Sequence, residues 1–116
     1  MKNIIHTLLS ITLLTGLAGN TYAAKKIEIA GQGIGGCGEW IAEKKSSRSM
    51  DAFNKVWILG YLSGRAASSN VDILRGTPNE SLFLWIDNHC NQYPLETIEG
   101  AGQMLFYELK KQKELE

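Results

Sequence analysis

The chain has 116 residues, of which 44% are hydrophobic and 21% charged, and its 12 basic side chains balance its 12 acidic ones. This length indicates one small domain, and the lack of a basic surplus argues against binding to nucleic acid. No internal repeat, low-complexity tract or linker divides the sequence.

The first 23 residues have the pattern of a signal peptide. Met1-Lys2 gives a positive start, IIHTLLSITLLTGLAG is the apolar stretch, and Ala23 is the small residue expected before a cleavage site. An uncleaved membrane anchor is the alternative, but the apolar stretch is short for a span of about 20 residues and is interrupted by glycines. We therefore expect residues 24–116 to be exported to a bacterial periplasm and not to remain in the membrane.

Residues 24–36 form a glycine-rich stretch with the spacing G-x-G-x-x-G at Gly31, Gly33 and Gly36. This spacing occurs in dinucleotide-binding loops, and Asp51 lies where a ribose-binding acid would be sought. A dinucleotide fold, however, needs several parallel strands with crossover helices, and the sequence after Cys37 predicts no strand. We expect an extended, flexible lead-in and no nucleotide cofactor.

Cys37 and Cys90 are the only cysteines. An even number in a small exported domain predicts a structural disulfide, and the alternatives are a metal site or a reactive thiol. After signal cleavage the only histidine is His89, which leaves too few ligands for a metal. Neighbouring helix positions point about 100° apart, so His89 is poorly aimed at Cys90. A disulfide closing a loop of about 53 residues would stabilise the domain by about 4 kcal/mol in the chain-entropy model.

Helical periodicity dominates the remaining sequence. A first helix is expected over CGEWIAEKK, from Cys37, and a second from Ser49 to Ser68, with Ser49 as its cap and Asp51 in its first turn. The second helix has apolar or small residues at helical spacing, namely Phe53, Val56, Trp57, Gly60, Tyr61 and Gly64. Residues 70–76 are expected to form the loop that follows.

The second helix also contains a ridge of small residues, Gly60, Gly64 and Ala67. Glycine lowers helix propensity, but a small-residue ridge lets another helix approach closely. We expect the ridge to serve helix packing, and a functional groove is the alternative.

A third helix is predicted to start at TPNE, where Thr77 and Glu80 would form a capping box around Pro78. Leu82, Trp85, Ile86 and Cys90 are expected to point inward, and Asp87 and Gln92 outward.

Pro94 is expected to open the last element. Its apolar stripe comprises Leu95, Ile98, Gly102, Leu105 and Leu109, with Glu96 and Glu99 on a solvated face. Residues 110–116 are a charged tail expected to fray or be solvated. The predicted architecture is all-α: a single domain, residues 24–116, built as a bundle of about four helices stapled by one disulfide.

The sequence does not predict an enzyme. A serine hydrolase would need His89 as its base, and no nucleophile elbow is present. Protein binding is the remaining class, without cofactor or metal. The candidate binding surface comprises Trp40, Trp57, Tyr61 and Trp85, and burial of these rings in the core is the alternative.

Several of these residues resemble the HdeA/HdeB family of periplasmic acid-stress chaperones, over residues 35–110. The likeness lies in Cys37 followed by Glu39-Trp40-Ile41, in the aromatic second helix around Trp57, and in WIDNHCNQYP. The resemblance implies a small disulfide-bonded helical protein that is dimeric at neutral pH. It also implies that acid loosens the protein and exposes apolar surface, which holds unfolding client proteins.

The charge of the expected mature chain is compatible with such behaviour. Carboxyl groups are neutralised below about pH 3 while basic groups remain charged, so the net charge would change from about −1 to about +12. Repulsion of this size can open a small bundle that a disulfide keeps compact.

A second resemblance is to the periplasmic immunity proteins of the Tai/Rap kind, which block type VI secretion effectors. It is carried by GYLSG at residues 60–64, followed by a later helix and a proline. It implies one dedicated partner at neutral pH, with SSNVDILRG as the candidate inhibitory loop, although this chain has fewer cysteines than those proteins. A structural subunit of an envelope assembly is a third class. The expected partners are thus unfolded clients or one protein, with a homodimer as a candidate assembly and no nucleic acid.

Overall fold

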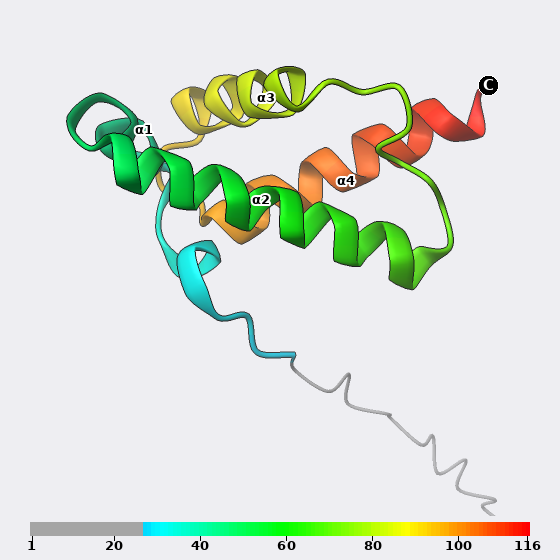
Figure 1. Cartoon of the computed structure of the whole chain (residues 1–116), viewed down its shortest axis with the longest axis horizontal. Coiled ribbons are helices and arrows are strands. Elements are labelled where there is room, and N and C mark those ends of the chain that lie inside the picture. Colours follow the sequence, from blue (N-terminus) through cyan, green and yellow to red (C-terminus); the bar gives the residue numbers. More distant parts are fainter. Residues whose placement is uncertain (1–26) are drawn as a thin grey trace, which may run out of the picture.

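The computed structural model describes residues 27–116, so the predicted signal peptide lies outside the described residues. The described chain forms a short 3-10 helix followed by four α-helices: η1 Gly31–Ile34, α1 Cys37–Ser46, α2 Arg48–Ser69, α3 Asn79–Gln92 and α4 Ile98–Glu114. The predicted all-α fold is confirmed. Figure 1 shows α2 running along the length of the molecule beside α4, with α3 on the opposite side of α4 and the lead-in leaving near α1.

A single residue, Ser47, separates α1 from α2. Its hydroxyl accepts a hydrogen bond from the Met50 amide at 3.3 Å, and this satisfies a donor in the first turn of α2. The prediction that Ser49 caps the helix is therefore wrong by two residues, whereas Asp51 lies in the first turn as expected.

The beginnings and ends of the last two helices differ in part from the prediction. Pro78 precedes α3 and no side chain caps the helix, so the expected capping box of Thr77 and Glu80 does not form. Thr97 caps α4 by accepting from the Gly100 amide at 3.0 Å. α4 continues to Glu114, so most of the charged segment 110–116 is helical, while remaining largely exposed.

One apolar core joins the four helices and the loop after α2. Its buried members are Cys37, Trp40, Ile58, Leu62, Ile73, Leu82, Phe83, Ile86, Cys90, Ile98, Ala101, Leu105, Phe106 and Leu109. Gly102, which was expected in the stripe of the last helix, is buried as well. Leu95 is 99% exposed, so its predicted place in that stripe is wrong: it precedes α4, in the turn from α3.

The predicted apolar face of α2 is also wrong. The helix buries Asn54, Ile58 and Leu62, which follow one another at four-residue spacing against α1 and α4. Phe53 and Val56, which belong to the set of apolar residues at helical spacing in the sequence, are 61% and 69% exposed. The buried row of α2 begins with the polar Asn54. Because Asn54 interrupts the apolar spacing, the sequence does not mark this row as the buried face of the helix.

The predicted disulfide between Cys37 and Cys90 is confirmed, with a Cα–Cα distance of 4.8 Å. It joins the first residue of α1 to the last turn of α3. The backbone adds further links at the same end of the molecule, because the Cys37 amide donates to the Glu96 carbonyl at 2.8 Å and the Gly38 amide to the Pro94 carbonyl at 3.1 Å. The turn between α3 and α4 is thereby fixed against the start of α1.

Candidate functional site

Asp87 lies at the contact between α1 and α3 and is 8% exposed. Its Oδ1 accepts a hydrogen bond from Trp40 Nε1 at 2.7 Å, and its Oδ2 pairs with Lys44 Nζ. Lys55 of α2 is close enough to attract the same carboxylate electrostatically. Asp87 was expected to point outward, but the structure places it inward because two donors of α1 satisfy it there.

Carboxylates also link the other helix pairs. Glu43 Oε2 of α1 accepts from Asn54 Nδ2 of α2 at 2.7 Å, and Glu99 Oε1 of α4 accepts from the Tyr61 hydroxyl of α2 at 3.1 Å. Within residues 27–116, every side-chain hydrogen bond that joins two different α-helices has a carboxylate as its acceptor. The polar links between helices therefore depend on groups that acid neutralises.

Sequence reasoning missed this set of bridges. One signal was available, because Asp87 lies four residues after Phe83 and three before Cys90, and such positions share one face of a helix. Since Cys90 was expected to be buried, Asp87 had to lie near the buried side as well. The partners of Glu43 and Glu99, like those of Asp87, lie on other helices, so the local sequence does not reveal the pairings themselves.

Trp57 and Tyr61 of α2 form the second feature. Their rings stack with centroids 5.2 Å apart, and Trp57 Nε1 donates to the Ala30 carbonyl of the lead-in at 2.9 Å. A Cβ atom at Gly33 would lie 1.9 Å from the Trp57 ring, so only glycine allows the lead-in to cover the indole. Gly31 and Gly33 thus serve close packing on Trp57, and the lead-in contains a 3-10 turn rather than being fully extended.

A groove of about 380 Å³ runs between the lead-in and α2. It is lined by Glu28, Ile29, Ala30, Val56, Trp57, Gly60 and Tyr61. Partial burial and the hydrogen bond to Glu99 raise the pKa of the Tyr61 hydroxyl above its ordinary value of 10.0. Tyr61 therefore remains a neutral hydrogen-bond donor throughout the physiological pH range.

His89 contacts two aromatic rings at the end of α3. Its ring stacks on Trp85 with centroids 4.9 Å apart, and the Tyr93 ring is tilted against it at the same distance. Its Nε2 lies 2.5 Å from Glu96 Oε2. Glu96 was expected on a solvated helix face, but it precedes α4 and instead fixes the α3–α4 turn to α3.

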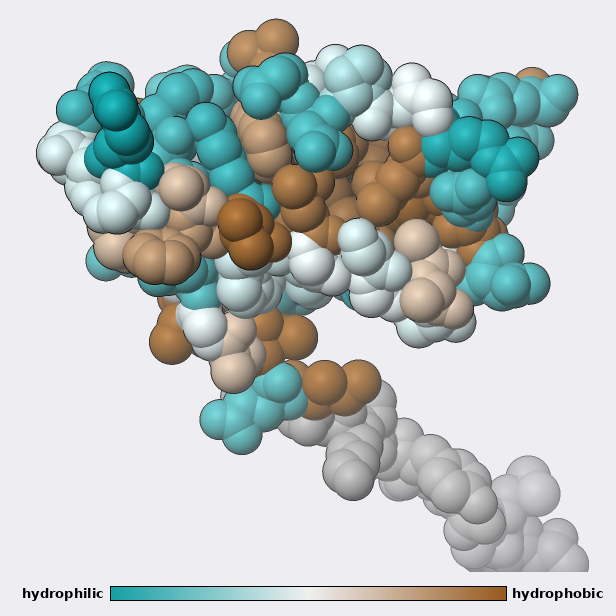
Figure 2. Space-filling model, viewed as in Figure 1, coloured by the Kyte–Doolittle hydropathy of each residue, from teal (hydrophilic) through white to brown (hydrophobic). Residues whose placement is uncertain are grey.

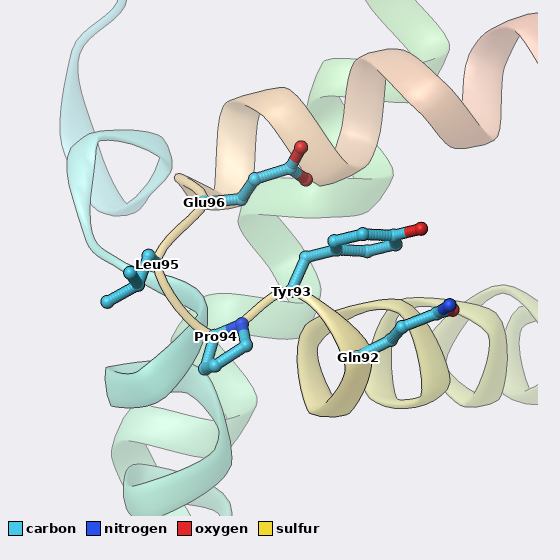
Figure 3. A pocket seen from close by; sticks show the side chains of 5 residues that line it. All are labelled: Gln92, Tyr93, Pro94, Leu95 and Glu96. Carbon is cyan, nitrogen blue, oxygen red and sulfur yellow. The ribbon is translucent and has the colours of Figure 1, made fainter.

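The α3–α4 turn presents an apolar side chain to solvent. Figure 3 shows the Tyr93 ring and the Glu96 side chain extending the same way from the turn, while Leu95 points in the opposite direction. A shallow pocket of about 370 Å³ is lined by Gln92, Tyr93, Pro94, Leu95 and Glu96. The turn combines a rigid backbone, held by the disulfide and its neighbouring hydrogen bonds, with an exposed leucine.

The four aromatic residues of the predicted binding surface do not form one surface. Trp40 is 2% exposed and belongs to the core, while Trp57 and Tyr61 lie together under the lead-in. Trp85 is half-buried on α3, beside His89. The structure therefore leaves two separate aromatic regions at which a partner can bind.

The small-residue ridge of α2 is exposed. A Cβ atom at Gly60 or at Gly64 would have no neighbour within 4 Å, and Ala67 is exposed as well. The helix that was expected to pack on this ridge is not found among residues 27–116.

The described residues contain no group of three or more His, Cys, Asp or Glu side chains that could hold a metal ion. Nor does any helix in residues 27–116 have the length and apolar character needed to cross a membrane. Comparisons with protein-family models, with curated proteins and with solved structures found no match to this chain.

Proposed function

We propose that this chain is an exported, non-enzymatic chaperone that holds unfolding proteins in acid. The observation that carries the proposal is the chemistry of the helix bridges, all of which have carboxylate acceptors within residues 27–116. A single change of condition, a fall in pH, therefore acts at once on every side-chain hydrogen bond between the helices of residues 27–116.

The consequences of protonation differ between the helix pairs. α1 and α3 remain joined by the disulfide when Asp87 is neutralised. α2 and α4 have no such covalent link. In strong acid Lys44 loses Asp87 as its counterion, and Lys55, which pairs with Asp51 and is also attracted by Asp87, likewise keeps its positive charge without a counterion. We therefore expect α2 and α4 to separate from a compact α1–α3 pair.

Separation of α2 and α4 would expose a continuous apolar surface. Ile58 and Leu62 of α2 are fully buried, and Leu105 and Phe106 of α4 are 2% and 3% exposed. Surfaces of this kind bind the apolar segments of unfolded chains, because burial removes apolar area from water on both sides. The client class is accordingly any envelope protein that unfolds in acid.

The test mixes the oxidised protein with an acid-labile client and follows aggregation by light scattering in acid and at neutral pH. The proposal expects suppression in acid only, together with a red shift of the tryptophan emission that reports exposure of the rings. A compact protein with unchanged emission and no suppression in acid would overturn it.

A charge-matched pair of variants sharpens this test. Replacing Glu43, Asp87 and Glu99 by the corresponding amides imitates protonation of the bridges, so this variant should hold clients at neutral pH. The control replaces Glu108, Glu114 and Glu116 by glutamine, which removes the same charge from carboxylates that join no two helices. If both variants behave alike, net charge rather than the bridges governs opening.

A second candidate function is binding of one dedicated partner at neutral pH, as an immunity protein does. The α3–α4 turn favours it, because Leu95 is 99% exposed on a backbone that is already fixed. This function predicts a stoichiometric complex with a secreted effector enzyme at neutral pH. The Leu95→Asp variant should no longer form this complex. Retention of the complex by Leu95→Asp would contradict it.

A further inference from the structure

Asn54 is the most deeply buried polar side chain of residues 27–116, with 3% exposure. Figure 2 shows hydrophilic atoms gathered at the end of the molecule where α1 lies and more apolar atoms over its middle. Asn54 lies in the first half of α2, in the buried row that continues with Ile58 and Leu62. A buried amide costs free energy unless its polar atoms find partners, so the partners of Asn54 indicate its role.

Only one half of the Asn54 amide has a partner in the described chain. Its Nδ2 donates to Glu43 Oε2 at 2.7 Å. This contact fixes the orientation of the amide, because the reverse orientation would bring two oxygens together. Oδ1 accepts from no donor of residues 27–116, whereas every side-chain nitrogen and oxygen of this segment that is sealed from water has a hydrogen-bond partner. Oδ1 therefore borders space that a water molecule can enter.

A small cavity between the lead-in, α1, α2 and the start of α4 provides this space. It has a volume of about 20 Å³, and its wall includes Gln32, Gly35, Glu39, Glu43 and Asn54. About 10–15 Å³ is enough for one water molecule, provided that the wall is polar. The cavity thus suits a single water and is too small for an organic ligand.

The wall of the cavity offers several hydrogen-bond acceptors. Asn54 provides Oδ1 from α2. On the side of the lead-in, Glu39 Oε2 and the Gln32 carbonyl oxygen lie 3.0 and 3.2 Å from the place that a Cβ atom of Gly35 would take. Because these three residues all line the cavity, the two oxygens converge at its wall. A buried water typically makes about three hydrogen bonds, and acceptors from different elements give its two protons partners.

The carboxylates of Glu39 and Glu43 raise the alternative of a bound cation. A calcium ion takes about six to eight oxygen ligands. Around this cavity, Glu39 Oε2 already accepts from the Gly36 amide at 3.0 Å, and Glu43 Oε2 accepts from Asn54. The described part of the chain also contains no group of three or more His, Cys, Asp or Glu side chains that could hold a metal ion. The wall therefore favours a neutral molecule that donates two protons.

We propose that one ordered water molecule occupies this cavity and joins Asn54 of α2 to acceptors of α1 and of the lead-in. The water satisfies Asn54 Oδ1 and links three elements that no single side chain joins. This assigns a role to the polar residue in the buried row of α2, because a leucine there could neither donate to Glu43 nor accept from the water. The inference does not depend on the proposed function, since it concerns the folded protein at neutral pH without a client.

Magnetic relaxation dispersion of ¹⁷O, which counts the long-lived water molecules of a protein, tests the site in solution. The oxidised wild type should hold at least one such water at neutral pH. Asn54→Leu should lower the count by one. Asn88→Leu is the matched control at an exposed position of α3, and it should leave the count unchanged. Equal counts in the wild type and in Asn54→Leu would overturn the proposal.

Gly35→Ala is a second variant, and it keeps the hydrogen bond between Asn54 and Glu43. The backbone of Gly35 is extended, with φ −67°, so alanine can adopt it. The added methyl group would lie between Glu39 Oε2 and the Gln32 carbonyl oxygen, and it should displace the water. Gly38→Ala is the control, because its Cβ atom would meet only the Pro94 carbonyl oxygen, at 3.5 Å. Equal water counts in the two alanine variants would contradict the site.

A high-resolution crystal structure of the oxidised wild type, grown in rubidium chloride, identifies the occupant directly and needs no variant. We expect density for one water within hydrogen-bond distance of Asn54 Oδ1, without an anomalous signal. An anomalous peak at this position would show a cation in place of the water, and a dry cavity would refute the inference altogether.

Discussion

The α1–α3 contact and the α2–α4 contact are built in different ways. α1 and α3 are joined by a disulfide and by Asp87, which accepts from Trp40 and pairs with Lys44. α2 and α4 meet through close apolar packing at Gly102, with one hydrogen bond between Tyr61 and Glu99. The first contact is covalent and ionic, and the second depends mainly on shape.

This difference indicates which part of the molecule can open. A disulfide persists in acid and limits the chain whether or not the carboxylates are charged. Apolar packing is also not titrated by acid. However, no covalent bond between α2 and α4 opposes the repulsion between the positive charges that remain in acid. We therefore expect the α1–α3 pair to be the persistent unit and the α2–α4 contact to be the one that yields.

Removal of the disulfide should lower the free energy of unfolding more than any other change, because it removes the covalent part of the α1–α3 contact. Replacing Cys37 and Cys90 by serine frees a loop with a sequence separation of 53 residues, which corresponds to about 4 kcal/mol in the chain-entropy model. For a small domain this is a large part of the free energy of unfolding. Chemical denaturation at neutral pH measures it, and a melt of the wild type that reductant leaves unchanged would contradict the expectation.

Loss of the Asp87 carboxylate should rank second. Asp87→Ala leaves Trp40 Nε1 buried without an acceptor and Lys44 without its partner, which should lower the free energy of unfolding by about 2 kcal/mol. Asp87→Asn is the matched control, since its amide oxygen still accepts from Trp40, and it should lose less. Equal losses in the two variants would show that the ion pair, and not the hydrogen bond to Trp40, matters.

Replacing each of two glycines by alanine should change the free energy of unfolding in opposite directions. Gly102→Ala places a Cβ atom 3.0 Å from Ile58 and Tyr61, and the Tyr61 ring is held by Trp57 and Glu99. We expect a net loss of about 1 kcal/mol, since overpacking exceeds the gain in helix propensity. Gly64→Ala meets no atom, so in dilute solution it should gain up to about 1 kcal/mol. Thermal melts of both variants test this, and the same sign for both would contradict the difference between the two faces.

The sequence predicted the existence of the helices better than their orientation. Helical spacing located α1, α2, α3 and α4 to within a few residues, and the even cysteine count predicted the disulfide. The buried face of α2 was missed because Asn54 interrupts its apolar row, while Phe53 and Val56 made the outer side look like the core. Periodicity reports that one face is apolar, but it does not report whether this face meets the same chain.

The polar bridges were harder to predict. Asp87 and Glu99 were expected on the solvated side, because an acidic residue on a helix is usually solvated, and Glu43 was given no role. Their partners lie 47, 11 and 38 residues away, so the pairing depends on the packed arrangement of helices. Local sequence carries no information about such pairs, apart from the shared face of Asp87 and Cys90.

The smallest expected effect concerns the single hydrogen bond between α2 and α4, and it is measured at high pH. The pKa of Tyr61 is raised by its burial and by Glu99, so the unfolded chain releases this proton at a lower pH than the folded protein does. The contribution of Tyr61 to stability is therefore present below about pH 10 and decreases as the pH rises further. Tyr61→Phe should lose less stability between neutral and strongly alkaline pH than the wild type.

Tyr107 provides the opposite case on α4. A hydrogen bond with Gln103 and the nearby guanidinium of Arg65 lower the pKa of its exposed hydroxyl, so its ionised form is favoured in the folded protein. The Tyr107→Phe variant should therefore lose at least as much stability as the wild type when the pH rises into the alkaline range. Lys55, whose pKa is raised by Asp51, titrates in the same range but is present in both variants and cancels in the comparison. Denaturant titrations of the three proteins across the alkaline range decide the matter. If Tyr61→Phe and the wild type lose stability in parallel, the Tyr61–Glu99 bond contributes nothing to the α2–α4 contact, which then rests on apolar packing and on Arg65 over the Phe106 ring.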